Sequence, residues 1–237
     1  MICDLKVNVL LPCRAGSQRI IKKNTRPFAG IKGGLLELKL RQLCESKFVD
    51  EIVVSSDDDE VLEFASGFGK NNPGKIFTCI PRPPEFAVAA PLDDFVEYVA
   101  TIMPQGLVFW THVTSPFFDG RCVDNLLRAY SDKVVNGIFD SMMTVLKEQT
   151  FMWDHNGVCI SHDRNKVSWP QTQDLPPVYL VNSAAFVVDR VVMLENSDRV
   201  GKCPYMYTVN KIEGFDIDWP EDFDMAERLF VVKHEKS

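Results

Sequence analysis

The chain lacks the features that define several large protein classes. It contains no run of about 18 apolar residues, so we expect no membrane-spanning helix. Its N-terminus lacks the basic start and the longer apolar core of a secretory signal peptide. A formal net charge of −7 over 237 residues argues against nucleic acid as the main partner. The hydrophobic fraction of 46% is nevertheless large enough for a substantial core, so we expect a soluble globular protein.

Cysteine patterns typical of metal centres and disulfide frameworks are also absent. The seven cysteines are scattered, with no CxxC pair and no metal-ligand spacing. We therefore expect reduced thiols in a cytoplasmic protein, most of them packed as small apolar groups. Cys13 lies in the first loop and could be exposed, but no histidine lies near it in the sequence to activate it as a nucleophile.

Two common phosphate-binding motifs, GxxxxGKS/T and GxGxxG, do not follow the first predicted strand, Val7–Leu11. A loop with five cations within thirteen residues stands there instead: Arg14, Arg19, Lys22, Lys23 and Arg26. Gly16, between the small Ala15 and Ser17, would let backbone N–H groups turn inward as a concave anion-binding nest. The loop is therefore either a di- or triphosphate site or an ordinary solvated basic loop.

Strand and helix patterns alternate along the first 130 residues. Strands are predicted at 7–11, 51–55, 76–80 and 107–111, and helices at 35–48, 58–67, 91–103 and 120–130. This alternation predicts an α/β fold with a mostly parallel sheet flanked by helices on both faces. Since ligands bind beyond the carboxyl ends of such strands, the first loop, the Arg82 loop and the loop 112–116 should meet at one edge. Pro81–Pro84 is predicted to be an exposed, stiff, non-helical connection.

The pattern changes after residue 130. Val134–Leu146 is a longer apolar stretch, and 151–160 predicts a hairpin with Asn-Gly in its turn. Strands are predicted at 178–188 and 205–209, and a closing helix at 220–232 is followed by a frayed tail. The aromatic, β-rich stretch from about 140 to 180 is predicted to pack on a second subunit.

Two acidic stretches have different predicted roles. The run Asp57–Asp59 is expected to cap the following helix, where negative charge suits the N-terminus, in preference to the alternative of metal binding. Asp216 and Asp218 are two residues apart in a segment predicted to be extended, so their carboxylates would project to the same side. Such a pair can hold Mg²⁺ together with waters and a substrate phosphate. Capping of the closing helix is the alternative, which Asp218 fits better than Asp216.

The stretch Leu11–Ile20, followed by Lys23 and Asn24, resembles the signature of the acylneuraminate cytidylyltransferases, the CMP-sialic acid synthetases. It departs once, with Gln18 where that family usually carries lysine. Further matching pieces follow in the same order at 53–57, 82–83, 114–116, 174–179 and 214–218. The resemblance implies one Rossmann-like domain of the nucleotide-diphospho-sugar transferase type over residues 1–237. It also implies a homodimer in which the insertion 140–180 dimerises and closes the partner's sugar pocket.

The resemblance also implies a reaction and a set of residues that perform it. CTP and a nine-carbon 2-keto sugar acid would give a CMP-activated nonulosonic acid and pyrophosphate, with Mg²⁺ held by Asp216 and Asp218. The implied catalytic residues are Arg14, Lys23, Asp216 and Asp218. The implied nucleotide contacts are Leu11, Arg14, Ala15, Gly16, Ser17, Asn24, Arg82, Ala87 and Asp93. The implied sugar contacts are His112, Thr114, Ser115, Tyr179 and Asn182.

The sugar side departs from the family pattern. His112 stands where the family has glutamine, and Asn182-Ser183 stands where it has Asn-Gly. Gln171, Thr172 and Leu180 occupy the region where family members often carry arginines. A different nonulosonic acid is therefore expected, such as a legionaminic or pseudaminic relative, with His112 a neutral hydrogen-bonding replacement rather than a general base. A nucleotidyltransferase for another sugar, and a non-catalytic nucleotide-binding family member, are the alternatives.

Overall fold

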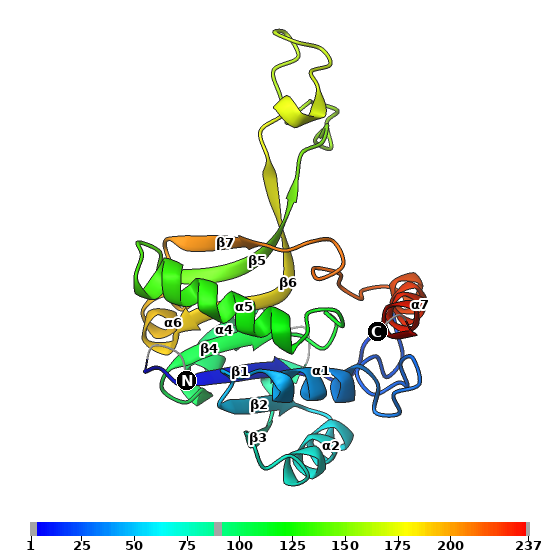
Figure 1. Cartoon of the computed structure of the whole chain (residues 1–237), viewed down its shortest axis with the longest axis vertical. Helices are drawn as coiled ribbons and strands as arrows, with labels where there is room; N and C mark the ends of the chain where they lie inside the picture. The colour runs from blue at the N-terminus through cyan, green and yellow to red at the C-terminus, as the bar shows by residue number, and fades with distance from the viewer. Residues whose placement is uncertain (1–3, 88–91, 236–237) are drawn as a thin grey trace.

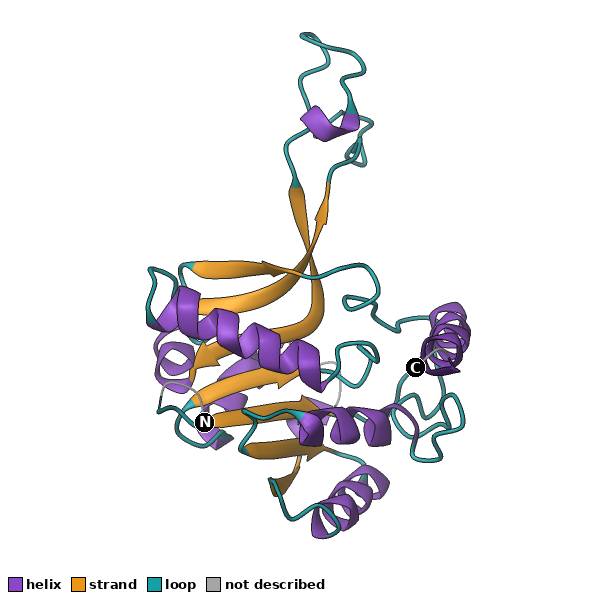
Figure 2. Ribbon diagram, in the orientation of Figure 1, coloured by secondary structure: helices purple, strands orange, loops and turns teal. Residues whose placement is uncertain are grey.

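The computed structural model describes residues 4–87 and 92–235, and within them seven strands form a single sheet (Figures 1 and 2). Its order is β3-β2-β1-β4-β6-β5-β7. The strands are β1 Val7–Pro12, β2 Glu51–Ser56, β3 Ile76–Pro81, β4 Leu107–Thr111, β5 Ser141–Glu148, β6 Val178–Asp189 and β7 Pro204–Thr208. The α-helices are α1 Gly34–Glu45, α2 Asp59–Lys70, α3 Pro84–Ala87, α4 Leu92–Ile102, α5 Gly120–Tyr130, α6 Arg190–Asn196 and α7 Pro220–Glu235. A π-helical turn covers Ser131–Val135, and a 3-10 turn covers Thr172–Asp174.

Most strand pairs are parallel, as the alternating pattern predicts. The pairs β3-β2, β2-β1, β1-β4 and β5-β7 are parallel, and only the two neighbours of β6 run antiparallel to it. Residues of α1, α2 and α5 cover one face of the sheet, and residues of α4 and α6 cover the other. Because both faces are covered, β1 is apolar nearly throughout and buried from Val7 to Leu11.

The predicted boundaries are close to the observed ones, with several exceptions that have physical causes. The prediction of an exposed, non-helical connection at Pro81–Pro84 holds only in part. Pro81 and Pro84 are exposed, but Pro84 begins α3, which the fixed φ of proline allows at a first helical turn. Arg82 is only 8% exposed. The predicted helix start at Pro91 lies outside the described residues. The closing helix continues to Glu235, three residues beyond its predicted end at Val232.

Asn182 and Ser183 lie inside β6, as the predicted strand 178–188 requires. The pairing of β5 with β6 shifts register between Met143 and Val145, and Ser183 has a φ of +60°. A side chain in this left-handed conformation is strained, by roughly 1–2 kcal/mol, where a glycine would not be. The irregularity marks the point where the two strands leave the sheet.

Beyond that point β5 and β6 continue as a twisted ribbon that carries residues 149–177 away from the sheet (Figure 1). We call residues 149–177 the arm. The arm contains the predicted hairpin, but its two sides are too short to count as strands. The Ile160 N–H donates to the Met152 carbonyl (2.9 Å), and Gly157 in the turn has a φ of +76°. Exposed apolar side chains on the arm and its base are Trp153, Val158, Ile160, Val167, Trp169, Leu180 and Val181. Dimerisation through this region stays a prediction.

Candidate active site

The loop after β1 is held in place by its neighbours. Ser56 Oγ donates to the Cys13 carbonyl (2.6 Å), and Asn24 Nδ2 donates to the Arg14 carbonyl (3.2 Å). The Ala15 N–H donates to Asp57 Oδ1 (2.8 Å), so this member of the predicted nest is already paired. Gly16 has a φ of +70°, which only glycine adopts at little cost. The loop is thus a preformed turn from which the Arg14 side chain projects into solvent.

Cys13 is buried rather than exposed. Its side chain is 1% accessible, and burial raises the pKa of its thiol to about 12. A thiol with that pKa is not ionised at neutral pH, which excludes it as a nucleophile or a phosphate contact.

Cationic side chains of this loop line two cavities beside it. A cavity of about 240 Å³ and another of about 320 Å³ are both lined by Arg14, Ala15, Ser17, Lys23 and Asn24. The first also contains Gly16 and Lys22, and the second contains Arg19 and Asp218. The predicted anion-binding residues therefore converge on open, positively charged space.

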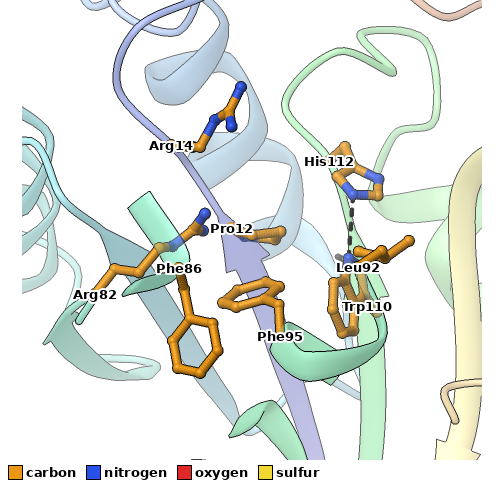
Figure 3. Close-up of a pocket in the computed structure, with 8 residues that line it drawn as sticks. All are labelled: Pro12, Arg14, Arg82, Phe86, Leu92, Phe95, Trp110 and His112. Carbon is orange, nitrogen blue, oxygen red and sulfur yellow. Dashed lines mark hydrogen bonds between the residues drawn. The ribbon is translucent and has the colours of Figure 1, made fainter. Parts of the chain in front are cut away.

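A third cavity, of about 260 Å³, lies between the loop and α4 (Figure 3). It is lined by Pro12, Arg14, Arg82, Phe86, Leu92, Phe95, Trp110 and His112. Arg82 stacks on the Phe95 ring at 4.3 Å, and its Nη2 donates to the Ser55 carbonyl (3.2 Å). Burial lowers the pKa of Arg82. The three loops predicted to meet at the carboxyl edge of the sheet do meet here. Arg14 lines all three cavities.

Asp216 is held between two other loops. The Ile217 N–H donates to the Thr114 carbonyl (2.9 Å), and Lys23 Nζ donates to the Ile217 carbonyl (2.9 Å). Burial raises the pKa of Asp216, while a hydrogen bond with the Thr114 side chain and the Lys23 charge oppose the rise. Burial also lowers the pKa of Lys23. A half-buried carboxylate and a half-buried ammonium at the strand ends are therefore close enough to influence each other's pKa.

Asp218 occupies the more exposed position, where it pairs with Arg19 (3.1 Å). It does not cap α7. Asp222 does so, since its Oδ2 accepts from the N–H groups of Asp218 (3.0 Å) and Trp219 (2.8 Å). The capping alternative for the Asp216–Asp218 pair is therefore wrong.

The two carboxylates fit a divalent cation whose remaining ligands would come from water and substrate. Asp216 Oδ1 is buried and has no hydrogen-bond donor within the described part of the chain, so a cation would satisfy it. No cluster of three or more His, Cys, Asp or Glu side chains able to hold a metal occurs in the same part. That donor set matches Mg²⁺, which is usually held by one or two carboxylates with phosphates and waters.

His112 is fixed as a neutral imidazole. Its Nε2 lies 3.1 Å from Trp110 Nε1, an indole that can only donate, so Nε2 accepts (Figure 3). Its Nδ1–H then donates to the Ser183 carbonyl (2.9 Å). Burial lowers the pKa of His112 to about 4. Both ring nitrogens are occupied, which favours the predicted hydrogen-bonding role over general-base catalysis.

We expect the His112 ring to stay neutral down to about pH 5, because its folded-state pKa lies near 4. Its ring ¹⁵N signals, assigned by their loss in His112→Gln, should show no protonation step between pH 8 and 5. A midpoint above pH 6 would contradict the neutral assignment and restore the general-base interpretation.

Other predicted contacts lie away from the three cavities. Leu11 is fully buried, Ser115 is buried, and Asp93 is exposed on α4. Tyr179 is 38% exposed at the base of the arm. Asn182 is buried, and its Oδ1 accepts from Thr144 Oγ1 (2.6 Å) and the Ala184 N–H (3.1 Å). Ala87 ends the short α3, and it and Thr114 are half-buried; neither lines these cavities.

Lys39 is a residue that sequence reasoning missed. It is 1% exposed, and its Nζ donates to the carbonyls of Ser115 and Phe118, both at 2.8 Å. Gln42 Nε2 supports the same loop through the Pro116 carbonyl (2.7 Å). The sequence does contain a sign that Lys39 is buried. Lys39 is four residues from both Leu35 and Leu43, which places it on the buried face of α1.

The fold and these clustered loops define an α/β protein with a nucleotide-type site at the carboxyl edge of its sheet. Solved structures with this fold include a CMP:2-keto-3-deoxy-manno-octonic acid synthetase complexed with CTP (TM-score 0.65, 14% identity, 96% of this chain and 99% of that one). Another is 4-diphosphocytidyl-2C-methyl-D-erythritol synthase from Anaerococcus prevotii (TM-score 0.68, 12% identity, 96% of both chains).

Sequence similarity identifies the family. Residues 8–236 match the cytidylyltransferase family, and the chain belongs to it. A pseudaminic acid cytidylyltransferase of Campylobacter jejuni serotype O:2 is 38% identical over an alignment of 243 positions, which covers 96% of this chain and 97% of the relative. A CMP-N,N'-diacetyllegionaminic acid synthase of Legionella pneumophila is 23% identical over an alignment of 238 positions, which covers 98% of this chain and 99% of the relative. The predicted family resemblance is thereby confirmed.

Proposed function

We propose that the protein transfers a cytidylyl group from CTP to a nine-carbon 2-keto sugar acid and releases pyrophosphate. The observation that carries the proposal is the meeting of the cationic loop with the Asp216–Asp218 carboxylates at the strand ends of a cytidylyltransferase-family chain. The names of the two similar relatives, a pseudaminic acid cytidylyltransferase and a CMP-legionaminic acid derivative synthase, support a nonulosonic acid as the acceptor.

The proposed chemistry needs positioning and charge neutralisation more than covalent help. A sugar hydroxyl attacks the α-phosphorus, and the bond from that phosphorus to the leaving pyrophosphate breaks. The guanidinium of Arg14, which projects between the cavities, suits phosphate oxygens, and the Lys23 ammonium neutralises charge on the pyrophosphate. Mg²⁺ bound by Asp216 and Asp218 would neutralise negative charge on the phosphates.

We assign the nucleotide to the space between the first loop and the aromatic cavity. Arg82 is held rigid by Phe95 and the Ser55 carbonyl, so its fork is preorganised at the cavity wall. Phe86 and Phe95 supply ring surface for a base in the same cavity. The sugar acid then lies toward His112 and Thr114, where the loops after β4 and before α7 meet.

A homodimer built through the arm is part of this proposal. The arm leaves the sheet and carries two exposed tryptophans, Trp153 at 41% and Trp169 at 64%, and exposed apolar surface of this kind marks sites of protein–protein contact. Sedimentation of the intact chain should give twice its 26.9 kDa mass. A cytoplasmic location is proposed because all six described cysteines are free thiols. No helix of the described residues could span a membrane.

The test is pyrophosphate release with CTP, Mg²⁺ and a panel of pseudaminic, legionaminic and neuraminic acids. Turnover with one of these acids and CTP, and at least about tenfold less with ATP, GTP or UTP, is the expected result. Turnover only with a sugar phosphate or with ATP would contradict the proposed function. Binding of CTP without turnover of any acid would instead support the non-catalytic alternative.

A further inference from the structure

The arm extends away from the sheet that carries the site described above (Figure 1). A cluster of nucleophilic and titratable side chains lies on it. Cys159 Sγ lies 3.4 Å from His162 Nδ1 and 3.5 Å from Ser161 Oγ. Ser161 Oγ itself lies 3.0 Å from His162 Nδ1. The small hairpin brings these groups together. An isolated antiparallel β-bridge pairs the backbones of Trp153 and Cys159, and the Met152 N–H donates to Ser161 Oγ (3.2 Å).

The histidine of this cluster is oriented as a base toward the thiol. His162 Nε2 lies 3.2 Å from the Ser168 carbonyl, which can only accept, so Nε2 carries the hydrogen. In the neutral ring, Nδ1 therefore presents its lone pair to Cys159 and Ser161. The Phe151 ring packs against the imidazole at 5.6 Å and limits its rotation. A thiol, a base and a carbonyl that orients the base are the elements that activate cysteine nucleophiles.

The surroundings also stabilise a negative sulfur. Partial desolvation alone would raise the pKa of Cys159, but hydrogen bonds from the Ser161 side chain and from the backbone of His162 and Ser161, together with the nearby Arg164 charge, lower it overall. Arg164 is held over the rings of Trp169 (4.8 Å) and Trp153 (5.7 Å). For the buried Cys13 and Cys122, by contrast, desolvation raises the pKa to about 12.

We propose that Cys159 is a modification site, a thiol activated by His162 that reacts with two-electron oxidants of the hydroperoxide class. The Cys159 proton moves to His162 Nδ1, and the thiolate attacks the distal peroxide oxygen. The S–O bond forms as the O–O bond breaks, and the leaving alkoxide or hydroxide takes the proton from His162. The products are a sulfenic acid on Cys159 and an alcohol or water, so sulfur is oxidised and the peroxide reduced.

The proposal is tested on the intact wild-type chain by comparing its own cysteines. At pH 6.5, iodoacetamide should alkylate Cys159 at least about tenfold faster than the exposed Cys203, measured peptide by peptide by mass spectrometry. Dilute hydrogen peroxide followed by dimedone should label Cys159 first. Equal or slower reaction of Cys159 than of Cys203, including protection by assembly of the arm, would overturn the proposal.

Two variants separate activation from simple exposure. His162→Asn removes the base and should bring the alkylation rate of Cys159 down to that of Cys203. His155→Asn is the matched control, since His155 is exposed in the turn of the same hairpin, and it should leave the rate unchanged. A Cys159 rate that is unaffected by His162→Asn would show that the histidine does not activate the thiol. The wild-type comparison stands even if the His162 variant folds poorly.

Discussion

Replacing Asp216 by asparagine should lower kcat/KM for CMP-sugar formation by about a thousandfold or more. The change preserves the size of the side chain but removes its charge, at a carboxylate whose Oδ1 is buried without a donor in the described part of the chain. If that oxygen holds Mg²⁺ against the phosphates, the variant loses charge neutralisation in the transition state, and raising the Mg²⁺ concentration should restore only part of the rate. Steady-state pyrophosphate release at varied Mg²⁺ measures both effects.

Asp224→Asn is the matched control for this change. Asp224 is exposed on α7, eight residues further along the chain, and its loss should alter kcat/KM by less than about twofold. An Asp216→Asn enzyme with near wild-type activity would exclude Asp216 as a metal ligand. Unchanged CTP affinity measured without Mg²⁺ would show that the variant keeps its fold and its nucleotide site.

Lys39 should make the stability of the protein rise with pH in the alkaline range. Burial lowers the pKa of Lys39 from 10.5 to about 7, so between these values the unfolded chain binds a proton that the folded chain does not. The free energy of unfolding therefore increases as pH rises from about 7 to 10.5, by up to about 1.4 kcal/mol per pH unit from this group. Below about pH 7 Lys39 is charged in both the folded and the unfolded chain, so the folded protein bears the full free-energy cost of burying the ammonium.

Lys39→Met isolates that contribution because it removes the titrating group and keeps an unbranched side chain that is only one heavy atom shorter. From urea unfolding at pH 7.5 and 9.0, the wild-type free energy minus that of Lys39→Met should increase by about 2 kcal/mol. The exposed Lys32→Met variant should show a much flatter difference from wild type. A Lys39→Met difference that does not change with pH would mean that Lys39 titrates normally in the folded protein.

The same lysine links stability to the site. Lys39 and Gln42 on α1 hold the carbonyls of the loop 115–118, and the adjacent Thr114 contacts Asp216. The wall of the site thus rests on a buried polar network that lies behind it. Loss of either donor would leave loop carbonyls without partners in a dry environment, at about 1–3 kcal/mol each.

The sequence by itself determined the parallel half of the sheet and the place of the phosphate loop. Short apolar runs such as Val7–Leu11 and Leu107–Thr111 are typical of strands that are covered on both faces. The helical periodicity of the segments between them predicts the helices that connect parallel strands. Since every such strand ends at the same edge, the meeting of Arg14, Arg82 and His112 followed from topology alone. Family membership followed from short motifs in a fixed order.

Only the tertiary structure decided which polar groups are buried and what they contact. Sequence reasoning left Arg82 on an exposed connection and Asp218 as a possible cap, whereas Phe95 covers Arg82 and Asp222 caps α7. Lys39 bonds to carbonyls about 76 residues away along the chain. Local propensity records only the conformations that neighbouring residues favour, while desolvation and hydrogen bonding depend on the packing of segments distant in sequence, so these properties arise only when the whole sheet has assembled.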